Sequence, residues 1–228
     1  METYVFGDSH AVCFTNIYLN KVHSYRASSA KGLNNKDSIS GVNNQIAEII
    51  TSLPENSNII MFFGKVDLDF IMNYKYNSIT QFDSNEYIIS IANSYVEFIK
   101  SVSLNKNVYI CELPITHIDD KHMLDIIRIE GHSRYINWHL TTDEMCSYFN
   151  FDKVIPYDIR VNLYILFNDT LKKICKLNNY VFIEINKYFI NEYGQFEIPS
   201  KYINTNDMLD HHLLPNISEL YIQSMGDI

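Results

Sequence analysis

The sequence predicts an α/β fold, a three-layer α/β/α sandwich around a central five-stranded parallel sheet. Short and almost wholly apolar segments alternate with longer segments whose apolar residues recur at helical spacing. Strands that are apolar on both faces are typical of parallel sheets covered by helices. The alternation of strands and helices along the chain implies crossover connections between parallel strands.

Five segments are predicted to be the strands of this sheet. Residues 4–6 are apolar and stop at Gly7, a residue type that tolerates a tight turn. Residues 58–63 are apolar after the initial asparagine and stop at Gly64. The remaining predicted strands are residues 22–25, 107–111 and 179–185.

Four segments with helical periodicity are predicted to be the main helices. The segment 38–52 is closed by Pro54, and a final helix is expected at 217–225. The segment 83–102 has one apolar face made of Tyr87, Ile88, Ile91, Tyr95, Phe98 and Ile99. The segment 157–176 is expected to bury a stripe made of Ile159, Leu163, Leu166, Phe167, Thr170, Leu171 and Ile174.

Composition and charge narrow the classes of function. The 228 residues, 46% of them hydrophobic, suit one domain spanning residues 1–228. The formal net charge is -9, and the sequence contains no Lys/Arg cluster. Both observations argue against a nucleic-acid partner. No signal peptide and no membrane span are predicted. The cysteines are far apart and predict buried thiols in a reducing, cytoplasmic compartment: Cys13, Cys111, Cys146 and Cys175.

Side chains able to carry out chemistry follow the first predicted strand. Asp8, Ser9 and His10 come directly after Gly7, and ligands of open α/β sheets bind where strands end. A serine hydroxyl needs a base within hydrogen-bond reach, most often a histidine. His10 is poorly placed to be that base, because neighbouring side chains on an extended chain diverge. The simpler alternative is that Ser9 only caps a helix.

A polar loop near the other end of the chain, residues 204–215, supplies candidate bases and acids. His212 is the candidate base, and His211 is the alternative. Asp210 is the candidate acid that orients the imidazole, and Asp207 is the alternative. A serine near one end and this cluster near the other together predict a nucleophile, base and orienting acid.

Backbone N–H groups near Ser9 are the candidate donors to an oxyanion. The proposed pair is the N–H of Ser9 itself and that of Gly32, which lies in a run of small residues at 26–33. The strand at 58–63 ends in a similar turn, which parallel strands would bring beside Ser9. The candidate substrate contacts are therefore Asp8, His10, Gly64 and Asp67.

Histidines are frequent between residues 115 and 151, which also hold the single tryptophan, Trp138. His117, His122, His132 and His139 are separated by 5, 10 and 7 positions, a spacing that fits no common zinc pattern. No metal and no other cofactor is therefore predicted. A metal-dependent hydrolase that uses these histidines with Asp8, Asp67 and Asp210 is the least favoured alternative.

Four blocks of the sequence resemble the SGNH (GDSL-like) hydrolases, in the family's order. Residues 7–10 (Gly-Asp-Ser-His) resemble the first block, and residues 27–33 the second, whose glycine N–H serves the oxyanion. Residues 64–67 and 210–213 stand where the third and last blocks should be. The resemblance implies a flavodoxin-like SGNH hydrolase fold over nearly the whole chain, with Ser9 as the nucleophile.

The sequence departs from the family pattern at two positions. Val66 occupies the place of the third-block asparagine, whose side-chain amide is aimed at the oxyanion in the family. Lys65, Asn34 or Asn35 are the alternatives for that donor. In the last block the acid precedes His212 by two residues rather than three.

The predicted function is that of a serine esterase or acyltransferase. The expected substrate is an O-acyl group such as O-acetyl on a carbohydrate, attacked by Ser9 to give an acyl-enzyme; the carbohydrate part rests on the resemblance alone. Arg160 and Asn168 resemble residues of intracellular family members encoded beside polysaccharide genes. The alternative is a non-catalytic relative that binds a glycan or nucleotide-sugar in polysaccharide biosynthesis. The oligomeric state is left open.

Overall fold

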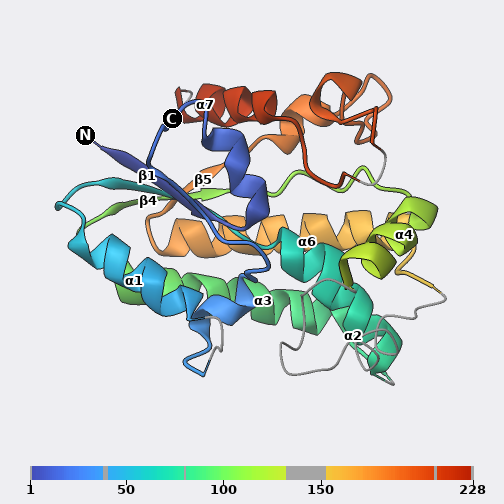
Figure 1. Cartoon of the computed structure of the whole chain (residues 1–228), viewed down its shortest axis with the longest axis horizontal. Coiled ribbons are helices and arrows are strands. Elements are labelled where there is room, and N and C mark those ends of the chain that lie inside the picture. Colours follow the sequence, from blue (N-terminus) through green and yellow to red (C-terminus); the bar gives the residue numbers. More distant parts are fainter. Residues whose placement is uncertain (1, 38–40, 80, 132–152, 208–209, 227–228) are drawn as a thin grey trace.

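A five-stranded, wholly parallel sheet forms the centre of the protein, in the order β2-β1-β3-β4-β5 (Figure 1). The computed structural model describes residues 2–37, 41–79, 81–131, 153–207 and 210–226. The strands are β1 (Thr3–Gly7), β2 (Val22–Ser24), β3 (Asn58–Phe62), β4 (Asn107–Cys111) and β5 (Val181–Ile183). The predicted α/β class and five-stranded parallel sheet are confirmed.

Apolar strands occupy the middle of the sheet because helices cover both of their faces. In β1 and β3, Val5 pairs with Ile60, and Gly7 pairs with Phe62 at the carboxyl ends. The side chains of Val5 and Ile60 are fully buried. This burial on both faces is the reason that these strands appear as continuous apolar runs in the sequence.

Helices form a layer on each side of the sheet (Figure 1). One face carries α1 (Val42–Ser52), α3 (Ser84–Val102) and α6 (Tyr157–Leu177). The opposite face carries the short helix η1 (Ser9–Phe14) and α7 (Ser218–Gly226), whose Phe14 and Tyr221 rings pack with centroids 5.2 Å apart. The three predicted layers are therefore present.

Two helices and a short helical turn lie beyond the carboxyl ends of the strands, in segments that were not predicted to be main helices (Figure 1). The turn η3 (Asp67–Ile71) runs directly into α2 (Met72–Ser78), and α4 is Asp120–Gly131. The shorter turns η2 (Lys31–Asn34), η4 (Asn186–Phe189), η5 (Ser200–Tyr202) and η6 (Pro215–Ile217) connect the remaining elements. Helices at this edge build walls around the site described below.

The buried face of α6 differs from the predicted stripe. Ile159 is exposed, whereas the polar side chains of Arg160, Tyr164 and Asn168 are buried. Hydropathy alone cannot identify this face, because its polar groups become buried only when specific partners satisfy them. The strand β5 is also shorter than the predicted segment 179–185, and α1 begins at Val42.

The cysteines that the structure describes, Cys13, Cys111 and Cys175, are free and buried, as expected. Cys146, His132, His139 and Trp138 lie outside the described residues. Among the helices that the structure describes, none combines the length and the apolar character needed to cross a membrane. The cytoplasmic location and the single-domain organisation stay predictions.

Candidate active site

Ser9 follows the carboxyl end of the inner strand β1 and is the first residue of η1. Asp8 caps this helix, because its carboxylate accepts a hydrogen bond of 3.0 Å from the backbone N–H of His10. Gly7 allows the sharp turn: a Cβ there would lie 2.5 Å from both the Phe62 carbonyl oxygen and the Ala11 Cβ. The turn leaves the Ser9 side chain partly exposed while its neighbours Asp8 and His10 are buried.

The loop that carries the candidate base is held over this edge by backbone hydrogen bonds. Ile203 and Leu213 form an isolated antiparallel bridge, and the Leu214 N–H donates to the Tyr202 carbonyl over 2.8 Å. The Asp210 N–H donates to the Asp207 carbonyl over 3.1 Å. These bonds fix the position of His212 between them.

Ser9, His212 and Asp210 form one chain of hydrogen bonds. His212 Nε2 lies 3.0 Å from Ser9 Oγ, and His212 Nδ1 lies 3.0 Å from Asp210 Oδ1. The same carboxylate oxygen also accepts the backbone N–H of His212 over 3.0 Å. The structure thus brings together the two residues from the last loop and the serine that the sequence singled out.

Asp210 is held in its ionised form. Partial burial opposes ionisation, but hydrogen bonds from the Asn204 amide and from His212 outweigh it, so the pKa of Asp210 lies below its ordinary value. A carboxylate at Nδ1 favours the tautomer in which Nδ1 carries the proton and Nε2 can accept one from Ser9.

The other two histidines of the site pack against His212. The ring centroids of His10 and His212 are 4.5 Å apart, and those of His211 and His212 are 4.1 Å apart. His211 is buried against Phe70, with ring centroids 5.3 Å apart. Burial, followed by the proximity of His212, lowers the pKa of His211 to about 4 and that of His10 well below its ordinary value. Both are therefore neutral at pH 7, and the structure pairs Ser9 with His212 rather than with the alternative base His211.

Known proteins resemble this chain in fold but not in sequence. No family model and no curated protein matches the sequence. A member of the lipolytic protein G-D-S-L family from Veillonella parvula matches over 100% of this chain and 97% of its own, with TM-score 0.51 and 14% identity.

The chain has the SGNH hydrolase fold. A catalytic mutant of an acetylxylan esterase from Geobacillus stearothermophilus shares it over 99% of this chain and 94% of its own, with TM-score 0.51 and 9% identity. An extracellular lipase from Streptomyces rimosus covers 100% of this chain and 99% of its own, with TM-score 0.50 and 10% identity.

Two carboxylates that were predicted to contact substrate, from their place after parallel strands, instead accept hydrogen bonds from backbone N–H groups. Asp8 and Asp67 are fully buried. Asp67 accepts the N–H groups of Ala30 over 2.6 Å and Lys31 over 3.4 Å, which ties η2 to the end of β3. Burial is the main reason that the pKa values of Asp8 and Asp67 are raised to about 7. The prediction that these carboxylates line the substrate site is therefore corrected.

The Gly64 backbone is also enclosed. Its φ is 128°, and a Cβ there would lie 2.9 Å from the Leu113 and Phe167 side chains. The Gly64 N–H donates to the Asp8 carboxylate, and this hydrogen bond lowers the pKa of Asp8 against the larger effect of burial. Gly64 thus shapes the turn that follows β3, and its contact with substrate stays a prediction.

The donors expected for an oxyanion are only partly available. The Gly32 N–H donates to the Ser29 hydroxyl over 2.9 Å, so the donor assigned by the resemblance is engaged. The Val66 side chain is 3% exposed and has no polar group, and its backbone N–H bonds Asp8. Ser9 is the first residue of η1, and the N–H groups of a helix's first turn have no partner within the helix.

Lys65, the alternative donor, is committed to a buried ion pair beneath the histidines. Its Nζ lies 3.2 Å from Asp69 Oδ2, and the Tyr164 hydroxyl donates to Asp69 Oδ1 over 2.6 Å. Burial raises the pKa of Asp69, but Lys65 and Tyr164 outweigh it and leave the pKa below its ordinary value. Sequence reasoning missed this network, although Lys65 and Asp69 are four residues apart, a spacing that brings side chains together on a helix.

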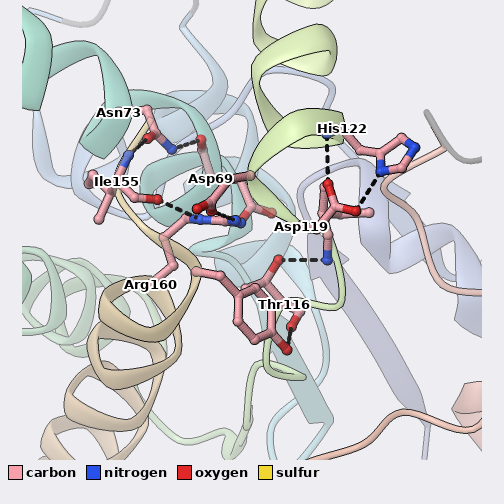
Figure 2. Close-up of polar contacts among 10 residues, drawn as sticks. Asp69, Asn73, Thr116, Asp119, His122, Ile155 and Arg160 are labelled. Atoms are coloured by element: carbon pink, nitrogen blue, oxygen red, sulfur yellow. Dashed lines mark hydrogen bonds and ion pairs between the residues drawn. The ribbon is translucent and has the colours of Figure 1, made fainter. Parts of the chain in front are cut away.

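Arg160 and Asn168 serve structural roles on α6. Arg160 is 1% exposed and donates from Nε to the Ile155 carbonyl over 2.9 Å, close to Asn73 and Asp69 (Figure 2). Asn168 bonds both the N–H and the carbonyl of Leu113, over 3.0 and 2.9 Å. Asn168 therefore fastens α6 to the loop after β4. Arg160 ties α6 to the segment that precedes it and, through an ion pair of 2.8 Å with Asp120, to α4.

A pocket opens beside Asp210, on the side of the loop that faces α4. Most of the residues that line it have polar side chains: His117, Asp119, His122, Asn204, Asp207 and Asp210. His122 and Asp119 contact each other there over 2.8 Å (Figure 2). A second groove shares His117 and Ile203 with this pocket and is lined by the aromatic rings of Tyr157, Phe189 and Phe196. The polar pocket and the aromatic groove adjoin at these two residues.

Proposed function

We propose that this protein is a serine esterase or acyltransferase that cleaves O-acyl groups through an acyl-enzyme on Ser9. The observation that carries the proposal is the hydrogen-bond chain Ser9–His212–Asp210, with 3.0 Å at each step. This is the nucleophile, base and orienting acid arrangement that activates a serine hydroxyl. The fold shared with the acetylxylan esterase and the extracellular lipase supports ester chemistry.

In the first half of the reaction, Ser9 Oγ attacks the acyl carbon while its proton passes to His212 Nε2. Asp210 stabilises the imidazolium that forms, through the hydrogen bond at Nδ1. The tetrahedral intermediate collapses when the alcohol leaves, and His212 returns the proton to the leaving oxygen. In the second half, water or an acceptor hydroxyl attacks the acyl-serine, with His212 again as base.

The oxyanion is stabilised by fewer donors than the SGNH pattern provides. The Ser9 N–H is the first donor, and the Gly32 N–H becomes the second when the Ser29 hydroxyl rotates away. Val66 supplies none. Because loss of one such donor typically costs a factor of about 10²–10³ in rate, slow turnover is expected.

A carbohydrate ester is the substrate class that the surroundings favour. The pocket beside Asp210 is lined mostly by carboxylates, histidines and an amide, which suit sugar hydroxyls better than an alkyl chain. The adjoining groove offers the exposed ring of Tyr157 and the partly exposed ring of Phe196 as surfaces for a sugar ring. An O-acetyl ester of a polysaccharide or oligosaccharide has both the hydroxyl groups that suit the polar pocket and the ring that suits the aromatic groove.

The alternative is a protein that binds a glycan or nucleotide-sugar at this site without turnover. The engaged Gly32 N–H and the apolar Val66 favour it, because both reduce support for an oxyanion.

A fluorophosphonate probe distinguishes these two functions. We expect the probe to label Ser9 stoichiometrically, and we expect p-nitrophenyl acetate to be hydrolysed with a loss of at least about 10³-fold in Ser9→Ala. The matched control, Ser52→Ala on the exposed surface of α1, should retain full activity. A folded protein that is not labelled supports the binding function, and turnover that persists in Ser9→Ala excludes the proposed mechanism.

A further inference from the structure

Three histidines from opposite ends of the chain converge beside Ser9. His10 comes from η1, and His211 and His212 come from the C-terminal loop. One ring nitrogen of each lies within 4.8 Å of the corresponding nitrogens of the other two. Tetrahedral zinc sites place their nitrogen ligands about 2.0–2.1 Å from the ion, so modest side-chain rotation would close this group around one ion.

His10 has a nitrogen that the catalytic arrangement does not use. Its Nε2 is buried and makes no hydrogen bond to any residue within the described parts of the chain. Buried polar atoms nearly always have a partner, so an unpartnered one requires an explanation. A buried imidazole without an acidic partner is neutral and has a lone pair that can bind a metal ion.

His212 is already oriented as a metal ligand would be. Its Nδ1 contacts Asp210, and histidines that bind metals commonly donate their other ring N–H to a carboxylate. Its Nε2 faces Ser9 Oγ. That lone pair can accept the serine proton or bind a metal ion, but it cannot do both at once.

The charges around the three rings permit a cation. Lys65 lies near His10 and His211 and would repel one, but Asp69 neutralises it at 3.2 Å. Asp210 contributes a negative charge directly behind His212. A set of imidazoles favours Zn²⁺ or a similar transition metal over Mg²⁺ and Ca²⁺, which prefer oxygen ligands.

We propose that His10, His211 and His212 form a binding site for a divalent transition metal ion such as Zn²⁺, and that the bound ion withdraws His212 from Ser9. Three nitrogens coordinate the ion, and a water molecule takes the fourth position. The ion then acts as a reversible inhibitor. The inhibitory half of this inference rests on the proposed function, whereas the binding half does not.

Calorimetric titration of the chelator-treated full chain with ZnCl₂ tests the binding half. We expect one ion per chain, and at least about tenfold weaker binding in His10→Phe and in Asp210→Asn, because ligands and the carboxylates that orient them both set metal affinity. The control His23→Phe replaces a half-buried ring that stacks on Phe6 with centroids 4.8 Å apart, and it should bind Zn²⁺ like the wild type. Ser9→Ala should bind at least as tightly, because the competing hydrogen bond is lost.

Binding that is absent, or equal in the wild type and His10→Phe, overturns the site. Absorption of the Co²⁺-loaded protein gives a second readout, since a tetrahedral nitrogen site produces intense visible bands that His10→Phe should lose.

Labelling of Ser9 by the fluorophosphonate probe, with and without Zn²⁺, tests the inhibitory half. We expect saturating Zn²⁺ to slow labelling at least about tenfold and a chelator to restore it. Saturable binding with unchanged labelling overturns the inhibition. Failure of the proposed function is distinguishable, because it appears as unlabelled Ser9 in the metal-free protein and leaves the titration unchanged.

Discussion

One carboxylate oxygen, Asp210 Oδ1, lies 3.0 Å from both the backbone nitrogen and the ring Nδ1 of His212. A spacing of two residues between acid and histidine therefore suffices to orient the ring. The backbone bond fixes the carboxylate, and the carboxylate fixes the imidazole. Asp210 is thus the residue that the geometry selects over the alternative acid Asp207.

Replacing Asp210 tests this assignment directly. We expect Asp210→Asn to lower kcat for p-nitrophenyl acetate by about 10²–10⁴, because the amide no longer favours the tautomer that leaves Nε2 free to accept. Asp207→Asn replaces the alternative acid, which lines the adjoining pocket, and should change kcat for this small ester less than about threefold if Asp210 is the orienting acid. Equal losses in the two variants would contradict the assignment.

The buried Lys65–Asp69 pair should dominate stability near the site. In Lys65→Met the Asp69 carboxylate loses its cation, and we expect a loss of about 3–5 kcal/mol in the free energy of unfolding at pH 7. The pKa of Asp69 in the folded protein lies below its ordinary value of 3.8. The ionised Asp69 therefore stabilises the wild type fully at pH values above 3.8, and this contribution is lost as the pH falls through the folded-state pKa. The penalty of Lys65→Met should therefore shrink in acid.

Urea denaturation at several pH values measures this effect. The double variant Lys65→Met/Asp69→Asn removes both charges and should recover part of the lost stability. A double variant no more stable than Lys65→Met would show that the unpaired charge is not the cause.

Asp67 should give the opposite pH dependence. Burial raises its folded-state pKa to about 7 from 3.8, so the folded protein keeps a proton that the unfolded chain releases between these values. The contribution of Asp67 to stability therefore falls as the pH rises from about 4 to 7. Asp67→Asn removes this pH dependence. As the pH rises from about 4 to 7, the free energy of unfolding of Asp67→Asn should therefore increase relative to that of the wild type by as much as about 4 kcal/mol.

Denaturant titrations at pH 5 and pH 8 check this expectation, with exposed Asp37→Asn as the control. A difference between Asp67→Asn and the wild type that does not change with pH would contradict it.

Gly7 should not tolerate a side chain. In Gly7→Ala the new Cβ would meet the Phe62 carbonyl and the Ala11 Cβ at 2.5 Å, and both are part of rigid elements. We expect a loss of about 1–3 kcal/mol or more in the free energy of unfolding, together with displacement of Ser9 from His212. Gly226→Ala, where no atom lies within 4 Å, is the control, and thermal unfolding with a labelling assay measures both effects.

The sequence by itself determined most of the sheet and the candidate serine and histidine of the site. Short apolar runs that stop at turn residues are typical of strands covered on both faces, so β1, β3 and β4 were predictable within about one residue of their bounds. The Gly-Asp-Ser-His turn and the Asp-His-His loop were recognisable because serine chemistry needs those residue types.

Only the tertiary structure decided which polar groups are buried and support the fold, and which are exposed at the candidate site. Asp8 and Asp67 appear in the sequence as candidate ligands, but they are buried because backbone N–H groups from His10, Ala30 and Lys31 need acceptors. The inward turn of Arg160 likewise depends on Asp120, which is 40 residues away in the sequence. The Lys65–Asp69 pair forms only because a helical turn follows β3 and brings the two side chains together. Hydrophobic pattern specifies where strands and helices form, whereas the pairing of buried polar groups is settled only when remote segments meet.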